Sequence, residues 1–173
     1  MKPKIVQLDS MTLLGFSFFG DPFQFSGDWS EENEIGRLWV RWIAYLTDHR
    51  AEIKHVADDR VHYEVHVHHA DSNRTGEFEI FAGLEVTRLE DVPVVLSAKV
   101  LPAATNALFT LRGKEITTDW PSLVGTERIP DAGYEMAGGY SIQRYDERFK
   151  GMQRVTESVL DVYIPVQPAT QNA

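Results

Sequence analysis

Asp161 and Tyr163 are the two residues whose types and spacing suggest a binding chemistry most directly. They lie two positions apart in the apolar segment 159–166, and side chains two apart in a strand project from the same face. An acid beside an aromatic ring suits a cationic aromatic ligand, because the ring offers stacking and cation–π attraction and the acid offers the countercharge. A solvent-facing edge strand would show the same alternation, so the sequence leaves both interpretations open.

A second acid lies in the segment 77–87, where residues alternate between the two faces of an expected strand. Glu85 shares one face with Phe81 and Gly83. The opposite face carries only apolar residues: Phe78, Ile80, Ala82, Leu84 and Val86. If the apolar face packs against a helix, Glu85 and Phe81 face a cleft, and Gly83 leaves room for a ligand to approach the backbone.

Gln143 and Tyr145 form a similar pair, two positions apart in another expected strand. The amide of Gln143 can donate and accept hydrogen bonds but cannot neutralise a cation. Tyr145 suits a ligand wall and, almost equally, a core tyrosine with a hydrogen-bonded hydroxyl. The countercharge for a cationic ligand is therefore expected from Asp161 or Glu85.

The segment 61–68 places imidazoles on one strand face, and this raises the question of a metal site. The polar face carries His62, Glu64, His66 and His68, and His69 is adjacent. Such residues at i, i+2 can share a zinc ion, but the sequence indicates no distant ligand, and a solvated strand face explains them equally well. We expect no metal and no cofactor, and the chain also lacks a glycine-rich phosphate loop and a nucleophile elbow.

The elements that must position these residues begin with the apolar, aromatic-rich segment 11–19, which predicts a strand. A helix should follow, with Ser30 as its N-cap. Its apolar face repeats at the i, i+3, i+4, i+7 spacing through Ile35, Leu38, Trp39, Trp42, Ile43 and Leu46. The segments 61–68 and 77–87 then predict an antiparallel pair of strands, because turn-forming residues separate them.

The same order of elements repeats more faintly in the second half. Segments 94–100 and 107–111 supply strand material, and 115–123 carries a short helical signal that Pro121 limits. Two more strands are expected from Tyr134 onward and over 159–166. We therefore expect a single α+β domain over residues 1–173, with half-units at roughly 5–90 and 94–166.

Bulk composition limits the classes of partner. The 173 residues include 26 acids and 17 bases, a net charge of −9 without a basic cluster, so direct nucleic-acid binding is not expected. No apolar run is long enough to cross a membrane, and the N-terminus lacks the apolar core of a secretory signal. A cytoplasmic location is therefore expected. The absence of cysteine excludes disulfides and thiol chemistry.

Five landmarks between Leu101 and Val166 occur in the order of a known family. They are the strand-like 107–111 closed by Gly113, Asp119-Trp120-Pro121, Gly133-Tyr134-Glu135, Gln143-Arg144-Tyr145-Asp146, and Asp161-Val162-Tyr163-Ile164-Pro165-Val166. This pattern resembles the C-terminal half of the GyrI-like, or AraC-type effector-binding, domains, and segment 76–86 resembles a strand in their first half. The resemblance implies tandem pseudo-symmetric β-α-β-β units whose antiparallel strands line a central ligand cleft.

The resemblance also implies binding residues. An acid–x–aromatic pair of the family matches Asp161 and Tyr163, and a tryptophan at the end of its second helix matches Trp120. Trp39, on the apolar helix face, is a further candidate wall, although that position also suits the core. The family commonly has Glu where this chain has Gln143, so the inherited mechanism holds only if another acid supplies the charge.

We therefore expect a stand-alone, non-enzymatic module that binds an amphipathic, aromatic, cationic small molecule. The expected ligand-binding residues are Trp39, Phe81, Glu85, Trp120, Gln143, Tyr145, Asp161 and Tyr163. Two alternatives remain: a hydrolase that opens a strained or electrophilic small molecule with a Glu and a Tyr, and a protein-binding inhibitor of the gyrase-inhibitor type. A role in transcription regulation would need a separate protein partner.

Overall fold

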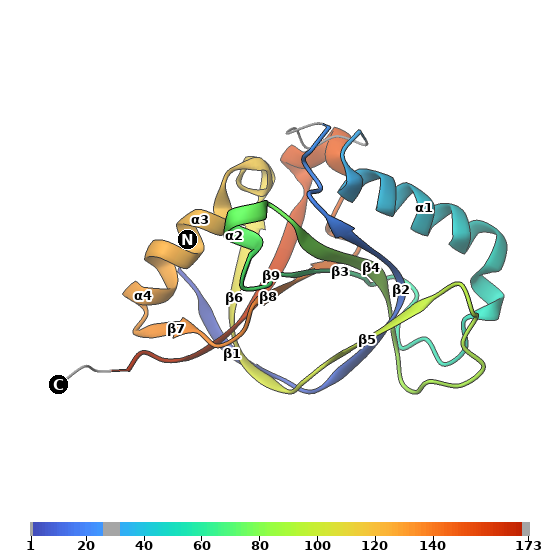
Figure 1. Ribbon diagram of the computed structural model, residues 1–173, viewed down its shortest axis with the longest axis horizontal. Coiled ribbons are helices and arrows are strands. Elements are labelled where there is room, and N and C mark those ends of the chain that lie inside the picture. The colour runs from blue at the N-terminus through green and yellow to red at the C-terminus, as the bar shows by residue number, and fades with distance from the viewer. Residues whose placement is uncertain (1, 26–31, 171–173) are drawn as a thin grey trace.

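The protein is a mixed α+β structure, seen here in a computed structural model that describes residues 2–25 and 32–170. In this part of the chain the strands pair in the order β1-β6-β9-β8-β3-β4-β2-β5, and β7 pairs with β9 beside this path (Figure 1). Every pairing is antiparallel. The strands are β1 (Lys4–Leu8), β2 (Met11–Gly20), β3 (His62–Val67), β4 (Phe78–Val86), β5 (Ser97–Leu101), β6 (Ala104–Arg112), β7 (Tyr134–Met136), β8 (Tyr140–Tyr145) and β9 (Val159–Pro168).

The helical segments lie outside the sheet (Figure 1). The α-helices are α1 (Glu34–His49), α2 (Ser72–Thr75), α3 (Trp120–Leu123) and α4 (Ile129–Asp131). Three short 3₁₀ segments are η1 (Arg50–Glu52), η2 (Gly113–Thr117) and η4 (Met152–Glu157), and η3 (Val124–Arg128) is a π-helical turn. None of the helices in the described part of the chain is both long and apolar enough to cross a membrane.

The two halves of the sheet repeat one pairing order. In the first half β2 pairs with β4, and β4 pairs with β3; in the second half β6 pairs with β9, and β9 pairs with β8. Strands β3 and β8 pair with each other and join the halves at the centre. The expected α+β fold of β-α-β-β units with antiparallel strands is therefore confirmed.

Two bent strand pairs connect the outer ends of the halves. Strand β1 runs into β2 and β5 runs into β6, and the antiparallel register continues across both bends from Met11 opposite Leu101 to Leu8 opposite Ala104. The sheet thereby curves round on itself and has an inner and an outer face (Figure 1). The inner face carries a buried apolar cluster of Leu13, Val61, Tyr63, Val65, Phe81, Leu101 and Ile142.

Helix α1 covers the outer face of the first half, as its apolar spacing predicts. Leu38 and Trp42 pack with Leu14, Ile80 and other side chains of β2 and β4 in one buried cluster. The helix begins after Asn33, whose side-chain oxygen accepts a hydrogen bond from the backbone N–H of Gly36 at 2.9 Å. Ser30, the expected N-cap, lies outside the described residues.

Helices α3 and α4 cover the outer face of the second half. Trp120, at the start of α3, is 3% exposed and belongs to a buried cluster with Phe109, Leu160 and Val162 of β6 and β9. The side chain of Asp119 caps this short helix by accepting a hydrogen bond from the backbone N–H of Ser122. Helices therefore cover the outer face of the sheet, and apolar side chains of the strands pack together on its inner face.

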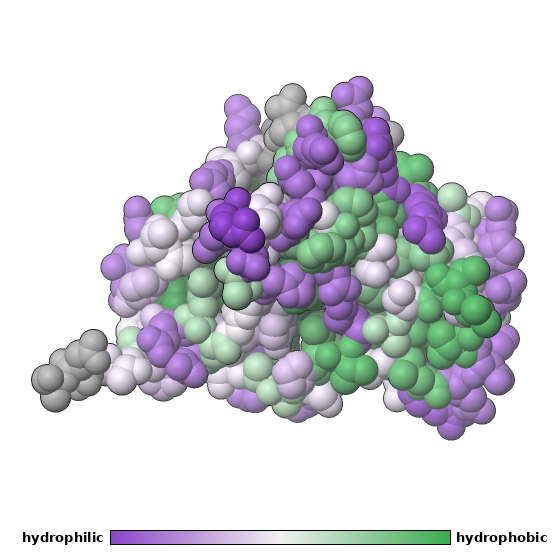
Figure 2. Space-filling view, in the orientation of Figure 1, coloured by the Kyte–Doolittle hydropathy of each residue, from purple (hydrophilic) through white to green (hydrophobic). Residues whose placement is uncertain are grey.

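The exposed surface mixes charged and apolar residues. Figure 2 shows one hydrophobic patch over the loop between β4 and β5, where Leu89, Val94 and Val95 are exposed. The sequence did not predict β1, because that strand is short and three of its five residues are exposed. Its strand conformation depends on pairing with β6, which lies about a hundred residues later in the chain.

Candidate functional site

The two central strands, β3 and β8, carry polar side chains on both faces of the sheet. Because side chains alternate, the outer face beneath α1 receives Glu64 and His66 from β3 and Gln143 and Tyr145 from β8. The inner face receives Tyr63, Val65, Ile142 and Arg144 from the same two strands. We call the polar groups beneath α1 the outer cluster, and we call those on the inner face of the sheet the inner cluster.

Glu64 is the centre of the outer cluster and is 1% exposed. One carboxylate oxygen accepts a hydrogen bond from Nε2 of Gln143 at 2.9 Å and lies 2.7 Å from Nε2 of His66. The other accepts a hydrogen bond from the indole N–H of Trp39. Among the described residues no lysine or arginine pairs with Glu64, so only dipoles and one imidazole face this buried carboxylate.

Aromatic rings surround the same carboxylate. The Trp39 and Tyr145 rings meet edge to face with centroids 4.9 Å apart, and Phe149 packs against the other side of Tyr145 at 4.8 Å. The hydroxyl of Tyr145 donates to Oε1 of Gln143 at 3.2 Å. Burial and the nearby charge of Glu64 raise the pKa of Tyr145 well above its ordinary value, so its phenol stays neutral and donates.

Helix α1 is fixed over this cluster by two indole groups. Trp39 donates to Glu64, and one helical turn later Trp42 donates through Nε1 to Nδ1 of His62 at 3.2 Å. Burial lowers the pKa of His62, which keeps its ring neutral and able to accept this bond. Trp42 is fully buried, whereas Trp39 is only partly buried, so of these two indoles Trp39 is the one that reaches the surroundings of the cluster.

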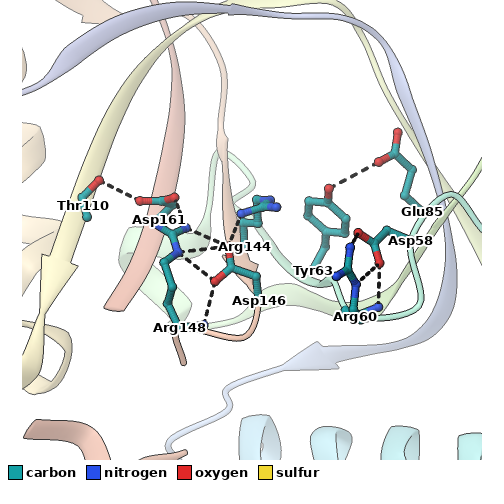
Figure 3. Close-up of polar contacts among 9 residues, drawn as sticks. All are labelled: Asp58, Arg60, Tyr63, Glu85, Thr110, Arg144, Asp146, Arg148 and Asp161. Carbon is teal, nitrogen blue, oxygen red and sulfur yellow. Dashed lines mark hydrogen bonds and ion pairs between the residues drawn. The ribbon is translucent and has the colours of Figure 1, made fainter. Parts of the chain in front are cut away.

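The inner cluster is a chain of ion pairs that crosses β6, β9 and the segment after β8 (Figure 3). Asp161 accepts a hydrogen bond from Oγ1 of Thr110 at 2.7 Å and pairs with Arg148. Arg148 also donates to Asp146 through Nε at 2.9 Å, and Arg144 pairs with Asp146 from β8. Hydrogen bonds from Arg148 lower the pKa of Asp146 to about 2.

A tyrosine and a glutamate continue the inner face onto β3 and β4 (Figure 3). The hydroxyl of Tyr63 donates to Oε2 of Glu85 at 3.3 Å. Burial, and secondly the charge of Glu85, raise the pKa of Tyr63 to about 12, so this phenol remains a hydrogen-bond donor. Asp58 and Arg60, also drawn in Figure 3, form a separate ion pair in the loop before β3.

The expected binding residues divide between three places instead of meeting in one cleft. Phe81, Glu85, Asp161 and Tyr163 share the inner face. Gln143, Tyr145 and Trp39 lie beneath α1 on the outer face, because positions 143 and 145 alternate with the inner-facing Ile142 and Arg144. Trp120 lies in the apolar core of the second half.

Two further expectations about the inner face need correction. Phe81 is fully buried in the inner apolar cluster, so it is packed against neighbours in this structure. Gly83 does not leave room for a ligand, because a Cβ there would lie 2.3 Å from the carbonyl oxygen of Leu14. The glycine instead permits the close approach of β2 and β4, where it faces Gly15.

The sequence interpretation missed Glu64 and the arginines of the inner cluster. Alternation in segment 61–68 identified a polar face correctly, but it gave no sign that α1 covers that face and buries Glu64. One signal was present: Trp39 and Trp42 form one side of a helix, and buried indole N–H groups need acceptors. Within the described residues no group of three or more histidine or acidic side chains is placed to hold a metal ion.

Comparisons with known proteins agree with this architecture. Residues 4–166 match the family described as integron-associated effector binding protein, Cass2. The transcriptional regulator BrlR of Pseudomonas aeruginosa is 29% identical over 168 residues, which are 96% of this chain and 56% of BrlR. The chain thus spans little more than half the length of that regulator.

Two solved structures share the fold at low identity. SAV2435 bound to tetraphenylphosphonium superposes with a TM-score of 0.68 at 13% identity, over 96% of this chain and 94% of SAV2435. A hydrolase encoded by lin2189 from Listeria innocua superposes with a TM-score of 0.52 at 10% identity, over 96% of this chain and 92% of the hydrolase. At these identities the likeness concerns the fold.

Proposed function

The chain belongs to the family of integron-associated effector binding proteins, and we propose that it binds an amphipathic aromatic cation beneath α1 with Glu64 as the countercharge. The observation that carries this proposal is the state of the outer cluster. Glu64 is 1% exposed, is hydrogen-bonded by Trp39 and Gln143, and has no lysine or arginine partner among the described residues. A buried carboxylate held mainly by neutral donors is strongly attractive to a ligand cation.

The position of Glu64 compensates for the neutral Gln143. The GyrI-like domains that the sequence resembles commonly carry Glu at that position, and here the amide of Gln143 instead donates to Glu64 on the adjacent strand. A carboxylate is therefore still present beside position 143, but it belongs to Glu64 of β3 and not to a residue of β8. Asp161 is less suited to the role, because Arg148 already pairs with it.

A ligand would reach Glu64 by taking the place of Trp39. The indole of Trp39 donates to the carboxylate and packs against Tyr145, so an aromatic cation in its place would meet the carboxylate with its charge and Tyr145 with a ring. Tyr145 and Phe149 then supply aromatic walls. SAV2435, which shares the fold, has been solved bound to tetraphenylphosphonium, a cation of this class.

Titration with tetraphenylphosphonium, followed by tryptophan fluorescence and by calorimetry, tests the proposal. We expect saturable binding at one site beneath α1, and a fluorescence change that disappears in Trp39→Phe while calorimetric binding persists. Glu64→Gln should weaken binding tenfold or more, since a charge-assisted contact contributes roughly 1.5–3 kcal/mol. Unaltered affinity in a folded Glu64→Gln variant would remove Glu64 from the site.

A second function has one specific observation in its favour. Tyr63 donates to Glu85 at 3.3 Å on the inner face, and a glutamate base beside a neutral phenol donor is a pair that can open a strained electrophilic ring. The Listeria hydrolase shares the fold. Steady consumption of an epoxide, reduced about a hundredfold or more by Glu85→Gln, would establish this activity; unchanged substrate after prolonged incubation favours the binding module.

A further inference from the structure

A cavity of about 470 Å³ opens where β2 ends and α1 begins. Its described lining comes from the end of β2, the segment that follows it, the first turn of α1 and the residues around the start of β4. The lining residues include Phe18, Phe19, Asp21, Phe25, Glu34 and Glu77. This volume lies within the range of sites that hold small organic molecules, about 300–1,000 Å³.

The chemistry of the cavity wall is aromatic and acidic. Phe19 and Phe25 are 60% and 70% exposed, so both side chains are accessible to a ligand. The carboxyl side chains of Asp21, Glu34 and Glu77 join the wall, and no lysine or arginine is among its described residues. Aromatic faces beside carboxylates attract organic cations.

One cation from the protein itself already uses part of this surface. The guanidinium of Arg37 lies 5.9 Å from the ring centroid of Phe25, and its Nη1 is 2.6 Å from a carboxylate oxygen of Glu34. Arg37 is well exposed, with 54% of its side chain open to solvent. The ring and the carboxylate are therefore spaced to accept a planar guanidinium, and the resident group is held only at the surface.

The cavity is distinct from the outer cluster. Glu64, Trp39 and Gln143 do not line it, and Phe78 lies between the two: its backbone pairs with Gly20 at the cavity, and its ring packs against His66 at 5.3 Å. A ligand at one place would therefore leave the hydrogen bonds of the other intact.

We propose that this cavity is a second ligand site, independent of the function proposed for Glu64, which takes small aromatic cations with a planar guanidinium or amidinium group. The ligand ring packs against Phe19, and its cationic group lies between Glu34, Glu77 and Phe25 in place of Arg37. Arg37 is therefore a competitor of the ligand, and its removal strengthens binding.

Calorimetric titration with phenylguanidine tests the proposal. We expect Arg37→Gln to raise affinity about three- to tenfold. The ligand no longer has to displace the cation–π contact and the ion pair of Arg37, and each of these exposed contacts changes a binding constant about several-fold. Glu77→Gln and Phe19→Ala should each lower affinity about three- to tenfold. Arg88→Gln is the matched control, because it removes a similarly exposed arginine that pairs with Glu90, and neither residue lines the cavity, so it should change nothing.

The outcomes separate this site from the one at Glu64. Glu64→Gln should leave phenylguanidine affinity unchanged, and neutral phenylurea should bind at least tenfold more weakly than phenylguanidine. The proposal is overturned if Arg37→Gln leaves affinity unchanged or lowers it, if Glu64→Gln abolishes binding, or if phenylurea binds equally well. Thermal unfolding of each variant establishes that a lost signal is a lost site, and Glu77→Gln, a surface change, remains informative if Phe19→Ala does not fold.

Discussion

The outer cluster beneath α1 and the inner cluster on the opposite face of the sheet differ in how their charges are balanced. In the inner cluster Asp146 and Asp161 each pair with Arg148, and Arg144 pairs with Asp146 as well. In the outer cluster Glu64 is more deeply buried but meets only neutral donors and one histidine. Among the described residues the acids of the inner cluster are therefore compensated by arginines, whereas Glu64 is uncompensated in the sense that it has no lysine or arginine partner.

This difference suggests a division of roles. A compensated ion-pair network holds elements together, because removing one member leaves its partners buried and unpaired. An uncompensated buried carboxylate contributes little to folding, since its desolvation opposes burial. It can, however, bind a ligand cation favourably. We therefore expect the inner cluster to govern stability and the outer cluster to govern ligand charge.

Arg148→Ala should have the largest effect on stability. It leaves Asp146 and Asp161, whose side chains are 6% and 10% exposed, without their shared partner. We expect the free energy of unfolding to fall by about 2–3 kcal/mol, less than for a fully buried pair because Arg148 itself is partly exposed and Arg144 remains. Urea denaturation measures this change.

Arg154→Ala is the matched control for that variant. Arg154 pairs with Glu157, and both side chains are more than half exposed. Solvent screens an exposed pair of this kind, so this change should be nearly neutral. Equal losses in the two variants would show that the inner cluster has no special structural role.

The next largest effect should appear in the pH dependence of the unfolding free energy at acid pH. The pKa of Asp146 is lowered to about 2 from an ordinary value of 3.8, so the unfolded chain binds the proton more readily. The contribution is complete above about pH 4 and is lost as the pH falls toward 2. We expect about 1–2 kcal/mol from this residue, seen as a shallower decline in unfolding free energy for Asp146→Asn below pH 4. An unchanged pH profile in that variant contradicts the assignment.

Glu64→Gln should have the smallest effect on stability, although Glu64 is the most deeply buried acid of the two clusters. The amide keeps the shape and one acceptor oxygen, and it removes a buried charge that has no lysine or arginine partner among the described residues. We expect the unfolding free energy to change by no more than about 1 kcal/mol in either direction. A loss as large as that of Arg148→Ala would mean that Glu64 is structural.

Much of the fold could be predicted from local patterns. The apolar spacing of α1 and the alternation of β3, β4 and β9 correctly predicted which face of each element is apolar. Each of these elements has one apolar face that must be buried. Strand β1 could not be found in this way, since its residues lack such a face and its conformation depends on β6. The family resemblance supplied the expectation of two tandem β-α-β-β units.

The candidate site was harder to predict because it depends on which polar face is covered. Alternation placed Glu64 and His66 on the same face of β3, and it placed Gln143 and Tyr145 on the same face of β8. It could not show that β3 and β8 are neighbours or that α1 covers these side chains. It likewise placed Asp161 and Tyr163 together, yet gave no sign that Arg148 returns from the loop after β8 to pair with Asp161. Tertiary contacts between distant segments decide which acids remain uncompensated.

The most direct test of this account compares two ligands of the same shape and opposite charge. Affinities for tetraphenylphosphonium and tetraphenylborate are measured by calorimetry in the wild type, Glu64→Gln and Asp161→Asn. We predict that the wild type and Asp161→Asn prefer the cation about tenfold or more, and that Glu64→Gln loses most of this preference. A preference that survives in Glu64→Gln and disappears in Asp161→Asn would place the ligand on the inner face and contradict the account.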